Sequence, residues 1–167
     1  MTPEDKLSQL EARLALLEAR ERLADTMNKY GHSIDYGDHS GWLDCFTEDG
    51  IFEITYHRRS SFPHLVRQFG EVTEHGVRYK GKQALGSFIE GHTHAPNAWH
   101  KHFLVESRVT FADQLTSANA ASYFARLDDR NDERIIMAFG RYIDDLKLGD
   151  DGMWRFSSRI VQVESAG

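Results

Sequence analysis

The chain has 167 residues, 40% of them hydrophobic and 28% charged, with a net charge of -6 at pH 7 and a pI near 5.8. This length suits one domain over residues 1–167, and the scattered basic residues exclude a surface built for nucleic acid or an anionic membrane. No apolar run of about 18 residues and no secretory N-terminal pattern occurs, which predicts a cytoplasmic protein. The single cysteine, Cys45, cannot form an internal disulfide and is expected as a small buried side chain.

The first segment predicts one long helix. Thr2 is suited to cap a helix that begins at Pro3. A helix over Pro3–Tyr36 would be roughly 50 Å long, more than a domain of this size spans, so a break or an overhang is expected near residues 18–21. Residues 1–20 could dock on the domain or extend to a partner subunit, although two heptads are too few to predict a coiled coil. The apolar positions repeat every three or four residues: Leu7, Leu10, Leu14, Leu17, Leu23, Met27, Tyr30 and Ile34.

The middle of the chain predicts short elements. A second helix is expected over Trp42–Phe46, a strand over Ile51–Tyr56 and a third helix over Gln83–Glu90. Residues 57–78 have no clean period and form a longer connection than usual, which favours a lid over a pocket or an extra hairpin.

The last third of the chain predicts strands. Segments of turn composition separate four strand-like runs, which are Trp99–Phe111, Ser117–Asp128, Arg134–Leu146 and Trp154–Glu164. Helices first and a meander of strands afterwards is the order of an α+β protein, not of alternating βαβ units.

A set of short motifs, in this order, resembles the SnoaL-like family, which belongs with scytalone dehydratase, ketosteroid isomerase and nuclear transport factor two. The resemblance covers residues 15–164. It implies a cone-shaped, curved mixed β-sheet, a half barrel wrapped around N-terminal helices with a deep pocket. The motifs are Tyr30-Gly-His-Ser-Ile-Asp35-Tyr-Gly-Asp38, Glu48-Asp49-Gly50-Ile51-Phe52, Tyr79-Lys80-Gly81-Lys82, Tyr142-Ile-Asp144 and Asp151-Gly152-Met153-Trp154-Arg155-Phe156 with Arg159.

The same resemblance indicates the catalytic residues. In its dehydratase and dehydrochlorinase branch a helix aspartate and a strand histidine form a dyad, and the matching positions here are Asp35 and His102. Tyr30 and Arg159 match further residues of that pocket, Tyr30 as a donor to an oxygen and Arg159 as a stabiliser of negative charge. One departure is Glu106, which stands where the branch often has asparagine.

The strand around His102 has alternating faces. Period two places His100, His102 and Glu106 on one face, so His100 is a candidate second contact to the substrate. His92 and His94 complete a group of four imidazoles that raises the alternative of a metal site. We expect no metal, because Ala95-Pro96-Asn97 interrupts the group and no carboxylate ligand stands at helical spacing from it; a mobile loop carrying His92 and His94 is the simpler explanation.

The expected substrate is a hydrophobic small molecule. Aromatic side chains are numerous enough to line a pocket for a flat apolar or aromatic compound. The candidate binding residues are His100, Trp42, Phe46, Phe52, Tyr56, Phe88 and Tyr123.

We therefore expect a lyase without a cofactor, in which His102 is the general base and Asp35 orients its imidazole. The alternatives are an isomerase or cyclase of the same fold, a non-catalytic β-subunit of a ring-hydroxylating oxygenase, or a ligand-binding module. Association through the open face of the sheet is common in this superfamily, which implies a homodimer or homotrimer.

Overall fold

The computed structural model describes residues 1–57, 66–130 and 133–165. Within these ranges the order of elements is two helices, three strands, one helix and four strands. This order confirms the predicted α+β class. None of the described helices combines the length and the apolar composition that a membrane crossing requires.

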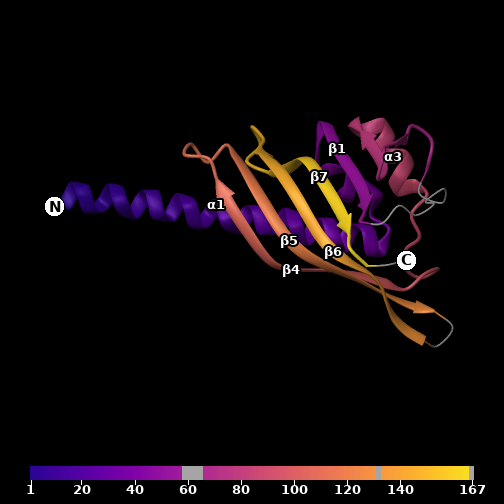
Figure 1. Cartoon of the computed structure of the whole chain (residues 1–167). Helices are drawn as coiled ribbons and strands as arrows, with labels where there is room; N and C mark the ends of the chain where they lie inside the picture. The colour runs from indigo at the N-terminus through magenta and orange to yellow at the C-terminus, as the bar shows by residue number, and fades with distance from the viewer. Residues whose placement is uncertain (58–65, 131–132, 166–167) are drawn as a thin grey trace.

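Helix α1 runs without interruption over Pro3–Tyr36. It begins with a capping box, in which the Thr2 hydroxyl accepts from the Asp5 backbone and the Asp5 carboxylate accepts from the Thr2 backbone. It ends at Gly37, whose φ of 76° is left-handed and suits glycine. Buried positions start only at Ala19, so the expected overhang is present and the expected break is not (Figure 1).

The other two helices and the first strand lie close to their predicted places. Helix α2 spans His39–Asp44, three residues earlier than expected, because Asp38 caps it by accepting from the Gly41 N–H at 2.8 Å. Strand β1 spans Phe46–Tyr56. Residues 47–50, whose turn composition predicted a break, belong to this strand, and its pairing with β7 is irregular there. Helix α3 spans Gly81–Glu90.

The strands form one mixed sheet in the order β2-β3-β1-β7-β6-β5-β4. Only the β1–β7 pair is parallel among the described pairs. The short strands β2 and β3 pair as a hairpin, so the extra hairpin expected within residues 57–78 is present, whereas the proposed lid falls partly on residues 58–65, outside the described ranges. The remaining strands are β2 (Glu71–Val72), β3 (Gly76–Lys80), β4 (His100–Phe111), β5 (Ser117–Arg130), β6 (Glu133–Leu148) and β7 (Trp154–Val163).

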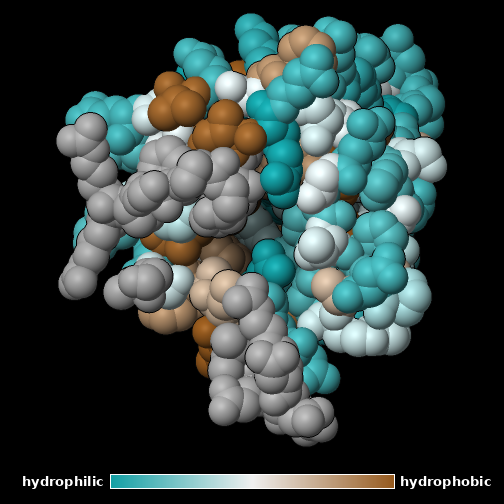
Figure 2. Space-filling view, turned by 90° about the vertical axis from the view of Figure 1, so that its right-hand side faces the viewer, coloured by the Kyte–Doolittle hydropathy of each residue, from teal (hydrophilic) through white to brown (hydrophobic). Residues whose placement is uncertain are grey.

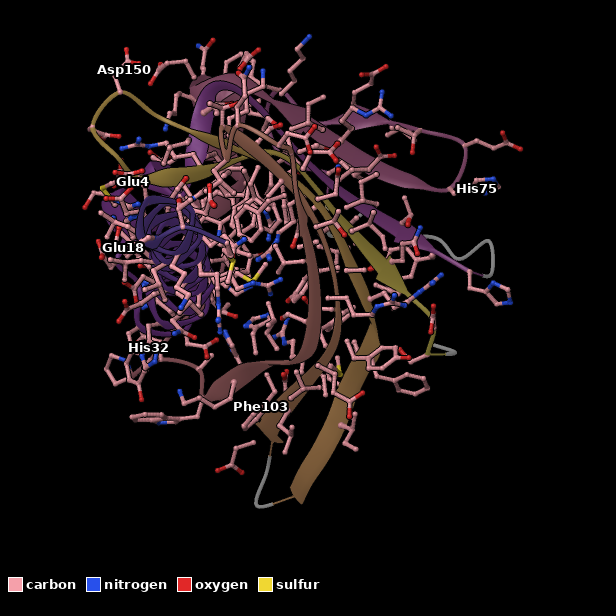
Figure 3. The ribbon with its side chains drawn as sticks, turned by 90° about the vertical axis from the view of Figure 1, so that its left-hand side faces the viewer. Glu4, Glu18, His32, His75, Phe103 and Asp150 are labelled. Carbon is pink, nitrogen blue, oxygen red and sulfur yellow. The ribbon has the colours of Figure 1, made fainter. Side chains whose placement is uncertain are left out.

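The sheet curves around the C-terminal half of α1 without closing. Figure 3, which looks along α1, shows the sheet on one side of the helix and side chains filling the space between them. The largest buried side chains of this core include Trp42, Phe46, Trp154 and Phe156. Figure 2 shows the end of the molecule away from the N-terminal projection, where the surface is largely hydrophilic and hydrophobic residues gather on one part of it.

Candidate functional site

Asp35 and His102 meet between α1 and β4. The Asp35 Oδ1 atom lies 2.6 Å from the His102 ring Nδ1, and Asp35 Oδ2 accepts from the His102 backbone N–H at 3.1 Å. Because a carboxylate only accepts, the Nδ1 atom carries a proton, so in the neutral imidazole the Nε2 atom is the one with the lone pair. The contact fixes both the orientation and the tautomer of the imidazole.

The end of α1 positions the carboxylate. Asp35 occupies the last turn of the helix, where the macrodipole disfavours a negative charge. The Asp35 carbonyl accepts from the Ala95 N–H at 3.1 Å, which ties this turn to the segment before β4. Burial raises the pKa of Asp35, but the hydrogen bonds and positive charge of His102 outweigh burial and hold that pKa below its usual value. Asp35 is therefore ionised at neutral pH.

A bulge in β4 changes the predicted alternation. The pairing of β4 with β5 shifts between Val105 and Arg108, and Glu106 takes a φ of 53°. His100 and His102 share one face, as expected, and this face points inward, but Glu106 is exposed and does not share it. The expectation that Glu106 belongs to this face is wrong, because period two holds only up to the bulge.

Two further histidines adjoin the dyad. The ring centroids of His92 and His100 lie 5.8 Å and 5.3 Å from that of His102, and 5.2 Å from each other. Burial lowers the pKa of His92 to about 2 and that of His100 to about 4, with nearby positive groups adding to the effect. Both rings are therefore neutral at pH 7. The expected loop bearing His92 is packed against the site at this point, since α3 ends at Glu90 immediately before it.

Three of these groups could approach a metal ion. Single ligand atoms of Asp35, His100 and His102 lie within 4.8 Å of one another. The His100 Nε2 atom is 3.7 Å from Asp35 Oδ1 and has no hydrogen-bond partner among the described residues. In the observed geometry, however, the closest contact of the Asp35 carboxylate is with His102.

A cavity of about 120 Å³ opens beside the dyad on the concave side of the sheet. Besides His102, its wall includes four residues proposed from the sequence: Tyr30, Phe52, Tyr56 and Phe88. A second cavity, of about 290 Å³, lies between α1 and β4, and His102, Tyr30 and Tyr142 line both. The other residues on the wall of the smaller cavity are Ile34, Ile54, His92, Phe124, Arg126, Ala138, Val161 and Val163.

Tyr30 reaches the cavity, whereas Arg159 lies behind it. The Arg159 guanidinium is fully buried and makes two hydrogen bonds of 2.8 Å to Asp144, its direct neighbour across β6 and β7. Its central carbon lies 4.1 Å from the centroid of the Tyr30 ring and 4.3 Å from that of Tyr142. Burial raises the pKa of Tyr30 to about 12, so its hydroxyl stays protonated and can donate.

Four proposed binding residues do not line the smaller cavity. Trp42 and Phe46 are buried in the core behind it, where their ring centroids lie 4.7 Å apart. His100 is buried beside Asp35 and lines a separate hollow with Trp99 and Leu127. Tyr123 lies on the outer face of the sheet with 54% of its surface exposed, because its neighbours Ser122 and Phe124 occupy the inner face.

Sequence reasoning missed Tyr142 and Arg126 as cavity residues. Tyr142 belongs to the motif Tyr142-Ile-Asp144. Alternation along β6 places Tyr142 and Asp144 on the inner face of the sheet, the same face as Arg159. Arg126 follows Phe124 at the same period of two on β5, but a lone arginine on a strand is ordinarily exposed. Here its guanidinium binds Asp128 at 2.7 Å and 3.1 Å, which compensates the charge at the cavity.

A family model described as a SnoaL-like domain matches residues 15–160, almost the whole described sheet and helix core. A search of curated proteins returned no significant match.

Solved structures of similar fold cover most of the chain. An NTF2-like protein with a cystatin-like fold from Novosphingobium aromaticivorans has a TM-score of 0.73 at 23% identity and covers 96% of this chain and 92% of its own. The β-subunit of a candidate aromatic-ring-hydroxylating dioxygenase from the same organism has a TM-score of 0.71 at 18% identity, with coverage of 92% and 94%. A candidate scytalone dehydratase, also from this organism, has a TM-score of 0.64 at 21% identity, with coverage of 93% and 89%. At these identities the likeness shows the fold, not the reaction.

Proposed function

Because this chain belongs to the SnoaL-like domain family, we propose that it is a cofactor-independent lyase acting on a hydrophobic cyclic or aromatic small molecule. The observation that carries the proposal is the 2.6 Å contact of Asp35 with His102 at the wall of a largely apolar cavity. An imidazole held by a carboxylate is suited to accept a proton from carbon and to return it to a leaving group.

His102 is the proposed general base. Its Nε2 atom carries the lone pair, since Nδ1 is engaged with Asp35. The ionised Asp35 would stabilise the imidazolium that forms when His102 takes a proton from the substrate. Such acid-base catalysis typically contributes about 10² to 10⁴ in rate.

Tyr30 is the proposed donor to the departing or polarised oxygen of the substrate. Its hydroxyl remains protonated because of the raised pKa, and its ring lies on the wall of both cavities. Arg159 would act as a positioning residue, because its guanidinium holds the Tyr30 and Tyr142 rings and is itself sealed from the cavity.

The walls of the cavity define the proposed substrate class. Phe52, Tyr56 and Phe88 offer apolar and aromatic contacts to a flat ring, while Trp42 and Phe46 support them from behind. Elimination of water, isomerisation and carbon-carbon cleavage can all begin with proton removal beside an oxygen function. Of these, we favour elimination of water, because a candidate scytalone dehydratase has the same fold.

A homodimer or homotrimer through the outer face of the sheet is proposed as the assembly. Phe103, Val105, Tyr123 and Phe139 form this outer apolar face: each is about half exposed, and the register of β4, β5 and β6 makes them neighbours. The same face favours the second candidate function, a subunit without catalysis, because a β-subunit of a candidate dioxygenase shares the fold. Stable association with a larger subunit during purification would favour that alternative.

The test is a screen of cyclic and aromatic β-hydroxy ketones for loss of water, with wild type and the variants Asp35→Asn and His102→Ala. We expect turnover by wild type and a decrease of about 10² to 10⁴ in kcat for each variant. Glu106→Gln serves as the matched control, since it removes a carboxylate charge from the same strand outside the site. Equal rates for all four proteins on a compound that wild type converts would refute the dyad mechanism.

A further inference from the structure

The leucines of the α1 projection lie on the wrong side of the helix to pack on this chain's own sheet. Leu7, Leu10, Leu14 and Leu17 are each about 60% exposed, although they repeat regularly. With about 100° between successive residues, their mean direction differs by roughly 150° from that of the buried stripe Leu23, Met27, Tyr30 and Ile34. The intact helix therefore cannot present both stripes to the same sheet.

The pictures agree with this placement. Figure 3 shows Glu18 on the side of α1 that faces away from the curved sheet. Leu14 lies about one helical turn before Glu18, so the two side chains share one side of the helix. Figure 1 shows the projection running out beyond the strands, where no other described residues approach it.

The charges beside the leucines are sorted by side. If Leu7 and Leu14 are taken as heptad positions a, and Leu10 and Leu17 as positions d, the e positions are Glu11 and Glu18. The corresponding g positions are Lys6 and Arg13. One flank of the stripe is thus acidic and the other basic, and all four residues are exposed.

This sorting selects one partner and one direction. In a parallel pair of identical helices, the g residue of one helix meets the next e residue of the other, which joins Lys6 to Glu11 and Arg13 to Glu18 on both sides of the seam. In an antiparallel pair, g meets g and e meets e, which opposes like charges. Arg20 continues the basic flank but lies 5.6 Å from the centroid of Phe111 of its own β4, so the charge pairing is confined to residues 6–18.

We propose that the leucine stripe of the α1 projection binds the same stripe of a second copy of this chain, in parallel and in register. The pairing buries apolar surface that would otherwise face water. It is independent of the proposed lyase activity and of the outer apolar face, which lies on the other side of the sheet from α1.

Disulfide trapping of the full-length protein tests both the partner and its direction. Leu10→Cys at a d position would face its own copy across the seam, within the Cα separation that a disulfide allows. Ala12→Cys is the matched control, because it is exposed on the opposite side of the same turn. The native Cys45 is buried and does not compete.

We expect Leu10→Cys to form linked dimers at least about tenfold faster than Ala12→Cys at micromolar concentration, because pairing raises the local thiol concentration. Adding Glu11→Lys and Glu18→Lys to Leu10→Cys should slow the linking about tenfold, since every pair across the seam becomes repulsive. Equal linking of the two cysteine variants would overturn the proposal. Preferential linking of a Leu7→Cys chain to a Leu17→Cys chain would also overturn it, because that result requires antiparallel helices.

Discussion

Asp35 makes two hydrogen bonds to His102: one carboxylate oxygen lies 2.6 Å from the ring Nδ1, and the other accepts from the backbone N–H at 3.1 Å. Asp35→Asn cannot satisfy both N–H groups when its nitrogen replaces one oxygen. We expect the His102 tautomer to shift toward protonation at Nε2 and the free energy of unfolding to fall by about 1–3 kcal/mol. Imidazole ¹⁵N NMR and urea unfolding measure the two effects. An unchanged tautomer in the variant would show that the carboxylate does not select it.

Acid should destabilise the fold through the buried histidines before it protonates the carboxylate. Because the folded-state pKa of His100 is about 4 and that of His92 about 2, the unfolded chain binds protons first as pH falls below about 6.5. Stability is therefore complete above that pH and is lost on acidification toward the folded values. The lowered pKa of Asp35 also contributes stability. This contribution is lost only when the pH falls through the folded-state pKa of Asp35, which lies below that of His100.

The measurement is urea unfolding at pH 7 and at pH 5. The loss between these values should be on the order of 1–2 kcal/mol for each neutral buried ring. His100→Asn should remove the part of this loss that comes from His100. His75→Asn, a change at an exposed turn, should leave the difference in stability between the two pH values unchanged. Equal stability of the wild type at both pH values would contradict the buried neutral state.

Part of the site follows from the sequence because it rests on local rules. The capping pattern at Thr2 and the apolar spacing predict α1, and its length predicts either a break or an overhang, of which the overhang is present. Asp35 and His102 are 67 residues apart, and their meeting depends on how the sheet curves around α1, which no local period encodes. Only the family resemblance pairs them in advance.

The remaining differences have physical causes. The bulge after Val105 turns Glu106 outward, and a one-residue irregularity of this kind has no reliable mark in the sequence. Tyr123 stands on a strand with aromatic neighbours, yet alternation alone does not say which face is the core. The family resemblance suggests Arg159 as a stabiliser of charge on the substrate, but the side chain is completely buried because Asp144 lies directly opposite it in the sheet.

The buried pair of Arg159 and Asp144 should matter far more for stability than an exposed pair of the same chemistry. Asp144→Asn leaves the guanidinium uncompensated beneath Tyr30 and Tyr142, and we expect a loss of about 3–5 kcal/mol in the free energy of unfolding. Glu164→Gln breaks the partly exposed pair with Arg141 and should cost less than about 1 kcal/mol. Thermal and urea unfolding compare the two variants; similar losses would mean that Arg159 is solvated.

Phe88 should govern both the stability of the core and the size of ligand that the cavity accepts. Its ring centroid lies 4.7 Å from that of Phe52 and 5.6 Å from that of Trp42, and its side chain lines the cavity of about 120 Å³. Phe88→Ala should lower the free energy of unfolding by about 3–5 kcal/mol and leave a larger cavity.

The matched control is Phe69→Ala, because Phe69 is half exposed and lines neither cavity, so its loss should cost less than about 1 kcal/mol. Calorimetric titration with one-ring and fused two-ring aromatic ketones then reports the cavity directly. Relative to wild type, Phe88→Ala should gain affinity for the two-ring compounds over the one-ring compounds, because the removed ring occupied the space that the second ring needs. If Phe88→Ala and Phe69→Ala changed this preference equally, the cavity beside His102 would not be where these ligands bind.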